Sequence, residues 1–387
     1  MSTTITGTSL NVNGNITTTN NGNISAAGDV EGISFNGGQL GGRRNLIING
    51  AMKVAQRSTS ETGITTSGYY TIDRFLTTLN SLGTWTQTQE TDAPDGFANS
   101  LKLECTTADA SPVGNKFLLI GQRFEGQDLH HLKKGTSSAE PVTASFWVKS
   151  NKTGTYIAEL LDQDNSARHI EKSFTVNSSG TWEYKTVTFE GDTTGVLVAD
   201  NSTSIDLNFW LGAGSNFNTG TLQTSWGTLS QTDRAVGNVN LADTIGNYFQ
   251  ITGVQLEVGE TATPFEHRSY GEELELCKRY YQKSYDYDTV AATNTIIGMS
   301  LSAVSGTNLG IYTQRLHPQM RDAPDVVVYD QPGNSGRINV QSTNNVTVNG
   351  GADITGLNKT TSSFQINNVV STSGDHFRFH FVAESEL

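Results

Sequence analysis

The chain has 387 residues, with 40 glycines, 7 prolines, 16% charged residues and a formal net charge of −13. This acidic balance argues against a nucleic-acid partner, which needs a basic surface for phosphates, and against binding to an anionic membrane. No apolar run is long enough to span a bilayer, and the first residues lack the basic and apolar regions of a secretory signal. The length allows two or three domains, and the many Gly, Thr, Ser and Asn residues favour short strands joined by polar turns.

Residues 1–42 have a repetitive texture of their own. The motif NGNI occurs at 13–16 and again at 21–24. Each short repeat carries a single apolar residue, so the segment cannot bury a core within one chain. It is therefore either disordered or wrapped around identical copies of itself, and the regular recurrence of β-branched residues favours wrapping.

Residues 43–270 read as an antiparallel sandwich. Short apolar-alternating runs are separated by Gly, Asn and Asp, which is typical of strands joined by turns. We predict strands at 75–79, 84–89, 100–105, 117–124, 142–149, 154–162, 169–176, 181–189, 204–212 and 248–258. The polar, weakly periodic stretch 214–243 predicts a long surface loop, and such loops are often functional.

The stretch 246–281 changes its period along its length. Up to Val258 it alternates as a strand does, and Gly259 and Pro264 then predict a turn. Over 271–284 the apolar residues recur at helical spacing, which predicts a short amphipathic linking helix. The predicted apolar stripe consists of Leu274, Cys277, Tyr280 and Tyr281.

Residues 285–387 form a further predicted block, a smaller C-terminal β-sandwich. We predict strands at 296–300, 308–313, 325–329, 337–341, 345–349, 363–370 and 376–383. The last of these alternates clearly, with Phe377, Phe379 and Phe381 expected on a core face and basic residues opposite.

Three stretches of the chain resemble bacteriophage tail fibre proteins. ITGVQLEVGETATPFEHRSYGEELELCKRYYQ, within 251–282, is similar to the closing segment of a carbohydrate-binding-module-like jelly roll found in such fibres. RNLIINGAMKVAQR at 44–57 with YTIDRF at 70–75 is similar to the opening of that module. MRDAP at 320–324 with FRFHFVAESEL at 377–387 resembles the C-terminal tip domain of many fibres.

The resemblance implies an all-β homotrimer with a fibrous N-terminal strand segment, a jelly-roll sandwich, a linking helix and a tip. It implies that residues 1–42 trimerise and attach the protein to a tail or baseplate protein. It also implies synthesis in the cytoplasm of a host bacterium and a place in the tail of the virion. The domain limits that we expect are 1–42, 43–270, 271–284 and 285–387.

One candidate ligand-binding surface lies on the central sandwich. If the predicted strands 142–149 and 204–212 share a sheet, alternation places five aromatic or polar side chains on one outer face: Trp147, Lys149, Asp206, Asn208 and Trp210. A sugar needs this mixture, because its ring stacks on an aromatic plane while its hydroxyls bond to polar groups. The alternative is that the tryptophans pack under a loop or against a neighbouring subunit. We interpret Trp182, at the start of another strand whose Val187 and Phe189 look like core residues, as a packing residue.

A second candidate surface lies on the tip. Its aromatic and hydrogen-bonding residues are Tyr285, Tyr287, Tyr329, His376, Arg378 and His380. Tyrosine-rich polar surfaces on a rigid sandwich suit recognition. In fibres the end remote from the virion usually meets the host, which favours the tip, although an ordinary solvated sheet face remains the alternative.

Cofactors and catalysis have little support in the sequence. Cys105 and Cys277 read as buried free thiols, although a disulfide stays open. The acidic surplus would allow a structural calcium, as in jelly-roll relatives, but no ligand set matches one, and we predict no metal site. Asp162 and Asp164 are the only carboxylate pair that suggests acid–base work, and no nucleophile motif accompanies them.

The sequence therefore predicts a non-enzymatic, trimeric receptor-binding tail fibre that attaches the virion to bacterial surface glycans. A structural tail or baseplate-associated fibre without receptor binding is the alternative. A polysaccharide depolymerase is a third possibility, which the absence of a long repetitive β-helix pattern disfavours.

Overall fold

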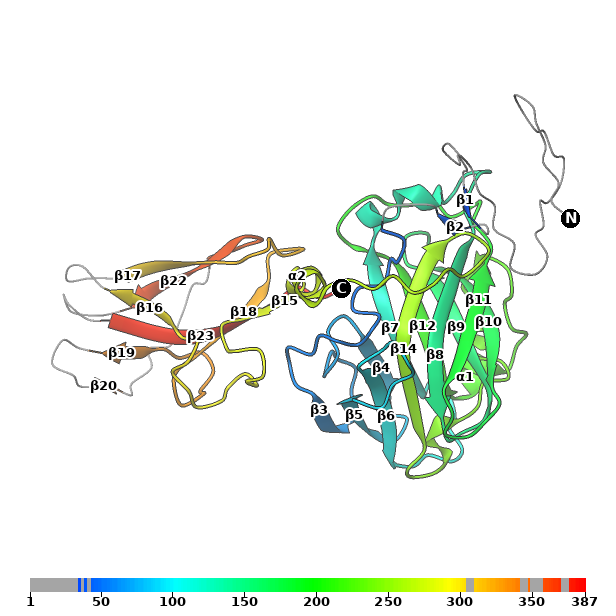
Figure 1. Cartoon of the computed structure of the whole chain (residues 1–387), viewed down its shortest axis with the longest axis horizontal. Helices are drawn as coiled ribbons and strands as arrows, with labels where there is room; N and C mark the ends of the chain where they lie inside the picture. The colour runs from blue at the N-terminus through cyan, green and yellow to red at the C-terminus, as the bar shows by residue number, and fades with distance from the viewer. Residues whose placement is uncertain are drawn as a thin grey trace, which may run out of the picture.

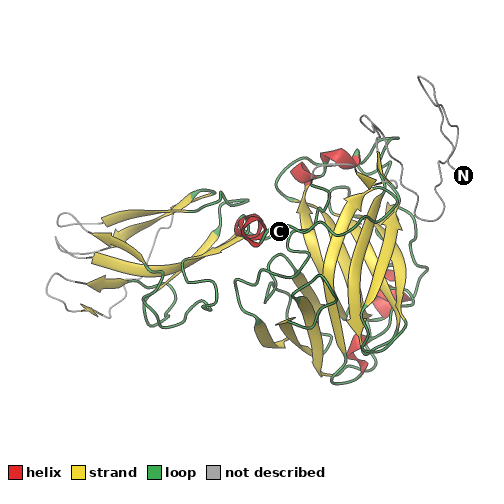
Figure 2. Cartoon of the chain, in the orientation of Figure 1, coloured by secondary structure: helices red, strands yellow, loops and turns green. Residues whose placement is uncertain are grey.

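The computed structural model describes residues 43–303, 310–341, 347–348, 358–369 and 376–387, together with 34–35 and 38–39. The described chain is all-β, as predicted, and its sheets are antiparallel (Figure 2). The predicted N-terminal fibrous segment lies outside the described residues except for the short hairpin β1 (Ser34–Phe35) and β2 (Gly38–Gln39).

Two six-stranded sheets form the central sandwich (Figure 1). Sheet 1 has the order β13 (Gly227–Thr228), β10 (Arg168–Val176), β9 (Gly154–Asp162), β12 (Thr203–Ala213), β7 (Phe117–Glu125) and β4 (Leu76–Asn80). Sheet 2 has the order β11 (Glu183–Phe189), β8 (Val142–Ser150), β14 (Tyr248–Val258), β6 (Ser100–Thr107), β5 (Thr84–Glu90) and β3 (Ser60–Ile64). All ten strands predicted between residues 75 and 258 are present, and the short β3 and β13 are additional.

Aromatic side chains from the two sheets meet in the sandwich core. Phe146 of β8 packs against Phe209 of β12 and Phe174 of β10, with ring centroids 4.8 Å and 4.9 Å apart. Tyr156 of β9 contacts Phe249 of β14. Because alternate residues of each strand point into this core, the remaining residues of the same strands point outward, and their environments differ between the two sheets.

The 214–243 stretch, predicted as a surface loop, covers the outer face of sheet 1. It contains α1 (Ser215–Asn218), β13 and the 3-10 turns η3 (Gln231–Asp233) and η4 (Leu241–Asp243). Phe217 and Ala235 pack with Trp210 and Ile157 of the sheet in a small cluster outside the main core. The stretch is therefore a packed layer on the sheet.

The opening and closing stretches that resemble a tail-fibre module lie together. Asn45 donates its side-chain N–H to the Val254 carbonyl at 3.1 Å, and the Asn49 backbone N–H donates to Glu273 Oε1 at 2.5 Å. Gly50 lies so close to β14 that an added Cβ would fall 2.1 Å from the Val254 oxygen. These contacts join the opening stretch to β14, an interior strand of sheet 2, and to Glu273 further along the chain, across more than 200 positions.

The linking helix is shorter than predicted. Helix α2 (Tyr270–Lys278) begins after Ser269, whose hydroxyl accepts the Glu272 N–H, and 281–283 forms strand β15 (Tyr281–Lys283) instead of continuing the helix. The reason is tertiary, because β15 pairs with the last strand of the chain. Tyr280 and Tyr281 are buried, as is Cys277, and both cysteines are free thiols as predicted.

The C-terminal block forms two further layers beyond α2 (Figure 1). In sheet 3 the central β23 (His376–Glu384) pairs with β15, β16 (Ser300–Ala303), β18 (Asp325–Tyr329) and β19 (Asn339–Gln341), and β19 pairs with β20 (Thr347–Val348). Sheet 4 has the order β17 (Gly310–Arg315), β22 (Ser363–Val369) and β21 (Asn358–Thr360). Phe377, Phe379 and Phe381 lie in the core, as predicted, whereas only Ser300 of the predicted strand 296–300 lies in a strand.

A buried ionic junction joins the sandwich to the C-terminal block. Glu386 pairs with Arg57 at 3.1 Å and also with Arg74. The Arg57 guanidinium lies 4.0 Å from the ring centroid of Tyr281, and that of Arg74 lies 3.5 Å from the ring centroid of Tyr280. Cations held both by a carboxylate and by an aromatic face fix the two blocks relative to each other.

Short 3-10 turns complete the described secondary structure: η1 (Gly126–Asp128) and η2 (His130–Leu132) follow β7. Within the described residues, neither the α-helices nor these turns have the length and apolar character of a membrane-spanning helix.

Candidate functional site: the outer face of sheet 2

The outer face of sheet 2 carries accessible aromatic side chains. Phe146 and Val148 of β8 point into the core, so Trp147 points outward, as predicted. Tyr184 of β11 is the register partner of Trp147, and their ring centroids lie 5.4 Å apart. Tyr184 is 45% exposed and Trp147 is half-buried, so part of each ring is open to solvent.

Polar groups lie beside these rings. Asp92, from the loop between β5 and β6, accepts hydrogen bonds from Lys149 Nζ at 2.5 Å and from Trp182 Nε1 at 3.1 Å. The Lys149 hydrogen bond, helped by that from Trp182, holds the pKa of Asp92 below its ordinary value. Trp182, which we interpreted as a packing residue, is half-buried at this site and donates its indole N–H to Asp92. We call Trp147, Tyr184, Trp182, Lys149 and Asp92 the aromatic patch.

A second group of rings borders the patch along β14. Phe97, Phe265 and His267 contact one another, with centroids 4.9–5.4 Å apart. Phe97 lies directly over Gly253, where an added Cβ would be 2.7 Å from its ring, and Gly253 has φ +62° in a bulge of β14. Its neighbour Thr252 is the register partner of Trp147.

The patch has the chemistry that a sugar requires. Flat rings with one accessible face can stack on the C–H side of a pyranose, while Asp92 and Lys149 offer an acceptor and a donor for hydroxyls. Most of the outward side chains of β14 are covered by the chain itself: Gln255 Nε2 donates to the Thr263 carbonyl and Thr252 Oγ1 donates to the Asn99 carbonyl. The accessible surface is therefore concentrated over β8 and β11.

The predicted surface that combined Trp147 with Trp210 does not exist. Trp210, Asp206 and Asn208 lie on β12 in sheet 1, whereas Trp147 lies in sheet 2, so their outward faces are on opposite sides of the sandwich. Trp210 is 1% exposed and packs against Phe217 at 5.4 Å. The alternation was assigned correctly, but the 214–243 stretch buries this face.

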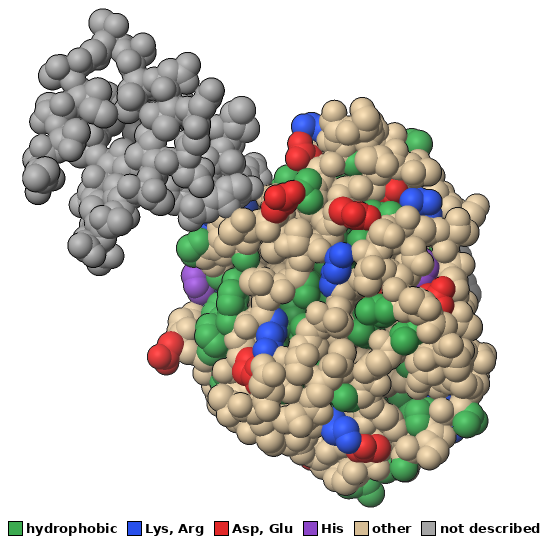
Figure 3. All heavy atoms as spheres, turned by 90° about the vertical axis from the view of Figure 1, so that its right-hand side faces the viewer, with side chains coloured by type: hydrophobic (Ala, Val, Ile, Leu, Met, Phe, Trp, Pro, Cys, Tyr) green, Lys and Arg blue, Asp and Glu red, His purple; other side chains and the backbone are tan. Residues whose placement is uncertain are grey.

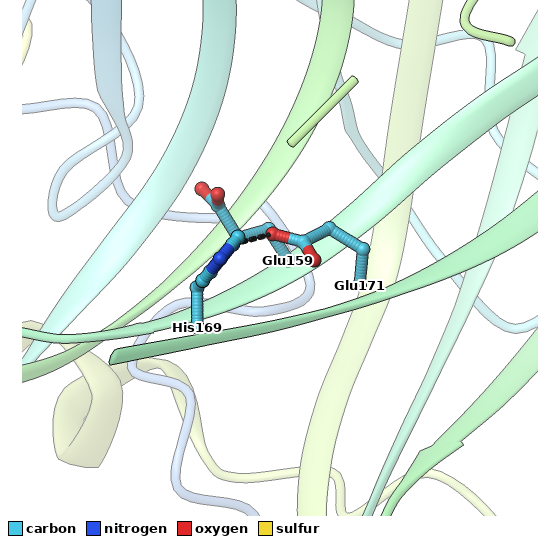
Figure 4. A group of neighbouring side chains, drawn as sticks. All are labelled: Glu159, His169 and Glu171. Atoms are coloured by element: carbon cyan, nitrogen blue, oxygen red, sulfur yellow. Dashed lines mark hydrogen bonds and ion pairs between the residues drawn. The ribbon is translucent and has the colours of Figure 1, made fainter. Parts of the chain in front are cut away.

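Under that covering stretch lies a charged cluster. Arg234 donates to both carboxylate oxygens of Glu159, at 2.6 Å and 2.8 Å, and Asn208 Nδ2 donates to the same group at 3.0 Å. His169 Nδ1 lies 2.6 Å from Glu171 Oε1 (Figure 4). The Ser230 backbone N–H donates to His169 Nε2, so the imidazole proton belongs on Nδ1, facing Glu171.

The electrostatics of this cluster follow from its burial. Burial, with the charge of Glu159 nearby, raises the pKa of Glu171 far above its ordinary value. Arg234 holds Glu159 in the charged form and lowers its pKa despite burial. Burial lowers the pKa of His169. The cluster thus holds one carboxylate paired with one guanidinium, a carboxyl group that retains its proton and a neutral imidazole.

Glu159, His169 and Glu171 are the single group of three acidic, histidine or cysteine side chains among the described residues whose ligand atoms lie within 4.8 Å of one another. The donor set does not fit calcium, which prefers six to eight oxygen ligands. Arg234 occupies both oxygens of Glu159, so a cation would have to displace the guanidinium.

A second concentration of buried oxygens is filled by a lysine. Lys134 Nζ donates to Asp162 Oδ2 at 2.6 Å and to the Gly195 carbonyl at 2.8 Å, and Asp192 Oδ2 lies 3.7 Å away. Lys134 and both aspartates are buried. Asp162, half of the carboxylate pair considered for acid–base chemistry, is thus a buried ion-pair partner, while Asp164 accepts the Ser204 hydroxyl at 2.5 Å.

A shallow hollow of about 620 Å³ opens beside the covering stretch of sheet 1. Phe117 and Phe217 line it together with Arg234, whose charge is already matched by Glu159. The remaining lining residues are polar and uncharged. It is a second accessible surface on the sandwich, but its two rings lean on each other and on Trp210 and present little free face.

The predicted tip residues are only partly accessible. His380 is buried, stacked on Tyr285 at 3.8 Å, with Nδ1 beside the Ser284 hydroxyl at 3.0 Å. Burial lowers its pKa, so it is not the exposed basic group that alternation predicted. Tyr329 and Arg378 are half-buried, and the side chain of His376 lies outside the described residues.

Sequence reasoning missed several residues of both faces. Tyr184 had a usable signal, because it alternates with the core residues Val187 and Phe189 in the predicted strand. Glu159 and Glu171 are register partners on adjacent strands, a pairing that strand prediction alone does not give. Asp92 and Arg234 reach their sites from loops, and nothing in their local pattern indicated it.

The surface turned away from the tip carries mixed charges. In Figure 3 acidic and basic side chains of the sandwich lie singly or in small groups among uncharged polar atoms, without a large area of one sign. This surface therefore offers no basic stripe of the kind that nucleic acid requires.

Comparisons with known proteins return structural likeness alone. No protein-family model matches the chain, and no curated protein sequence matches it. Among solved structures, an enzymatically active domain of tailspike protein 4 from bacteriophage CBA120 matches at 12% identity and a TM-score of 0.30, covering 55% of this chain and 21% of that one.

Two further matches cover whole modules. A putative sugar-binding protein of Bacteroides thetaiotaomicron matches at 13% identity and a TM-score of 0.31, covering 56% of this chain and 100% of the other. A family 11 carbohydrate-binding module of Clostridium thermocellum, in complex with a mixed-linked tetrasaccharide, matches at 10% identity and a TM-score of 0.28, covering 53% and 99%. Likeness of this degree does not establish a shared activity.

Proposed function

We propose that this chain is a receptor-binding tail fibre protein of a bacteriophage, which attaches the virion to bacterial surface glycans through the aromatic patch. In this proposal it acts as a homotrimer, with residues 1–42 attached to a tail or baseplate protein of the virion. It is made in the cytoplasm of the host bacterium. Three weak sites on one fibre would raise the effective affinity by repeated attachment.

The observation that carries the proposal is the pair Tyr184 and Trp147, which are side by side on a rigid sheet with part of each ring open to solvent. Adjacent aromatic side chains that stay accessible on a sheet face are typical of surfaces that meet a partner. The adjacent Asp92 and Lys149 supply the hydrogen-bonding groups that a sugar needs.

The tail-fibre assignment rests on the residues that carry the resemblance. The opening stretch 44–57 and the closing stretch 251–282 lie against each other through the Asn45 and Asn49 contacts. Their direct contact gives a physical reason for both motifs to occur in one module.

We propose binding without catalysis. The carboxylates that could serve as an acid–base pair in glycoside cleavage are covered: Glu159 and Glu171 lie beneath the 214–243 stretch, and Asp162 is paired with Lys134. A polysaccharide chain has no access to any of them in this fold.

The test is binding of the purified full-length protein to an array of bacterial surface polysaccharides. The Trp147→Ala and Tyr184→Ala variants should each weaken binding to the recognised glycan about 10-fold or more, because a stacked aromatic is worth at least about 1–2 kcal/mol at the centre of an interface. Tyr270→Ala is the matched control, since Tyr270 is 44% exposed but lies on α2. It should bind like the wild type.

Thermal unfolding of each variant separates loss of binding from loss of fold. If all three variants stay folded and bind with unchanged affinity, the patch is not the binding surface. If the wild type binds no polysaccharide on the array or on intact bacteria, the receptor-binding proposal fails.

One observation favours a structural fibre as the second candidate. The buried junction of Arg57, Arg74 and Glu386 makes the sandwich and the C-terminal block a stiff unit, which suits a spacer. Under that candidate Trp147→Ala and Tyr184→Ala would leave adsorption of the virion unchanged, whereas Glu386→Gln would reduce the yield of assembled fibre.

A further inference from the structure

We propose that the aromatic patch selects uncharged glycans and discriminates against those that carry carboxylate or phosphate groups. This inference rests on the proposed glycan-binding function and names the chemical class of the ligand. It follows from how the positive charges of sheet 2 are arranged.

Every basic residue in the strands of sheet 2 already has an acidic partner. The six strands contain three lysines and no arginine: Lys102, Lys149 and Lys185. Their amino groups lie 2.5 Å from Glu104, 2.5 Å from Asp92 and 2.6 Å from Glu183, respectively. Recognition of carboxylate or phosphate normally uses a free guanidinium or ammonium group, and these strands present none.

Two of these pairs, Lys149–Asp92 and Lys102–Glu104, lie on the outward face that carries the patch, whereas Lys185 is the register partner of the core residue Phe146. Lys149 is the register partner of Gln250 on β14, and Gln250 is the register partner of Lys102 on β6. The two outward lysines therefore lie in one row across the sheet, on either side of Gln250. At the end of β8, Lys152 forms an ion pair with Asp243. The positive groups around the patch are therefore balanced locally.

The Lys149–Asp92 pair is held by more than mutual attraction. Trp182 Nε1 donates to the second oxygen of Asp92, so the carboxylate keeps its place through two donors. An acidic sugar competing for Lys149 would have to displace Asp92 or lie next to its negative charge. Either alternative costs binding free energy, and the net charge of −13 adds long-range repulsion.

A neutral sugar meets no such cost. Its hydroxyls can donate to the remaining lone pairs of Asp92 and accept from the remaining hydrogens of Lys149 without breaking the pair. Its ring can stack on Trp147 and Tyr184, whose interaction does not depend on a ligand charge.

The experiment uses a matched pair of ligands. An acidic bacterial polysaccharide that contains uronic acids is compared with the same polymer after chemical reduction of its carboxyl groups to primary alcohols. Binding of the full-length protein to both forms is measured at low and at high salt. We expect the reduced polymer to bind about 10-fold more tightly at low salt, and the difference to shrink at high salt because screening weakens the repulsion.

Asp92→Asn provides the gain-of-function test. It frees the Lys149 ammonium and should shift the preference toward the acidic form by several-fold. Asp95→Asn is the control, because Asp95 is exposed in the same loop and its substitution changes the net charge equally. It should leave the preference for the reduced polymer unchanged. Lys149→Gln, which removes the cation, should keep that preference.

The outcomes separate the two proposals. Tighter binding of the acidic form by the wild type, or no change of preference in Asp92→Asn while both forms are bound, overturns selection by charge and leaves glycan binding standing. Failure of the wild type to bind either form, or any other polysaccharide of the array, overturns the proposed function itself.

Discussion

The two outer faces of the sandwich begin from the same strand pattern and end in opposite states. On sheet 2, Trp147 and Tyr184 stay partly open to solvent. On sheet 1, Trp210 is the corresponding outward tryptophan, and the 214–243 stretch buries it beneath Phe217. Alternation fixes which side of a sheet a residue faces, but coverage by another segment decides whether that side is a surface or a second core.

The covered face also shows what coverage demands. Polar outward residues that would be solvated on an open face need hydrogen-bonding partners once they are buried. Arg234 of the covering stretch provides such a partner for Glu159. On the open face the charged groups Lys149 and Asp92 satisfy each other while still facing the solvent. Substitutions on the two faces should therefore separate stability from binding.

The largest expected effect is the difference in the free energy of unfolding between two tryptophan variants, one on each face. Trp210→Ala should lower the free energy of unfolding by about 3–5 kcal/mol, because it leaves a cavity between sheet 1 and its covering stretch. Trp147→Ala should cost about 1 kcal/mol or less, since its ring is only half-buried. Urea unfolding followed by fluorescence measures both. Equal losses in the two variants would contradict the distinction between a covered and an open face.

An intermediate effect is expected at the arginine of the covered face. Arg234→Lys keeps the positive charge but loses the two-point hydrogen bond to Glu159, and should cost about 1–3 kcal/mol through buried oxygens left without donors. Lys149→Arg on the open face is the counterpart and should change stability by less than about 0.5 kcal/mol. Amide hydrogen exchange in residues 214–243 should be faster in Arg234→Lys and unchanged in Lys149→Arg.

The smallest expected effect is a pH dependence of stability. Burial raises the pKa of Glu171, so the folded state binds more protons than the unfolded state above the ordinary value of 4.5. Its contribution therefore reduces the free energy of unfolding as pH rises. Glu171→Gln, which resembles the protonated group, should be more stable than the wild type near pH 8 and little different near pH 5, and the difference should grow as pH rises between these values.

Glu183 on sheet 2 should change the stability with pH in the opposite direction. Hydrogen bonds to Lys185, Ser178 and Asn177 outweigh its slight burial and lower its pKa to about 2. The charged Glu183 stabilises the folded state above the ordinary pKa of a glutamate, and this stabilisation is lost as pH falls through its lowered pKa. Glu183→Gln should therefore lower the free energy of unfolding at neutral pH and leave it unchanged in acid. If Glu171→Gln and Glu183→Gln changed the free energy of unfolding in the same direction at neutral pH, the opposite pKa shifts assigned to the two residues would be refuted.

Local patterns in the sequence predicted the strands of the sandwich well, because period-2 alternation is set by a single buried core. They failed at Tyr281, which the helical stripe included but which β23 recruits into a strand from about 100 residues away. They failed at Trp210 for a similar reason, since nothing near it in the chain indicates that a later segment covers it. Trp147 and Lys149 were placed outward correctly, and their role in binding stays a prediction.

The ionic junction has a consequence for the order of events during synthesis. Arg74 and its partner Glu386 are separated by 312 positions. At translation rates of 5–20 residues per second, about 15–60 s pass between the appearance of the guanidinium and that of the carboxylate. During this interval Arg74 lacks its acidic partner Glu386, whereas Arg57 already has Asp73 of the sandwich 3.6 Å away. Docking of Glu386 can therefore follow only well after the sandwich has been synthesised, and proteolysis of ribosome-bound intermediates should find the surface around Arg74 open until Glu386 has emerged.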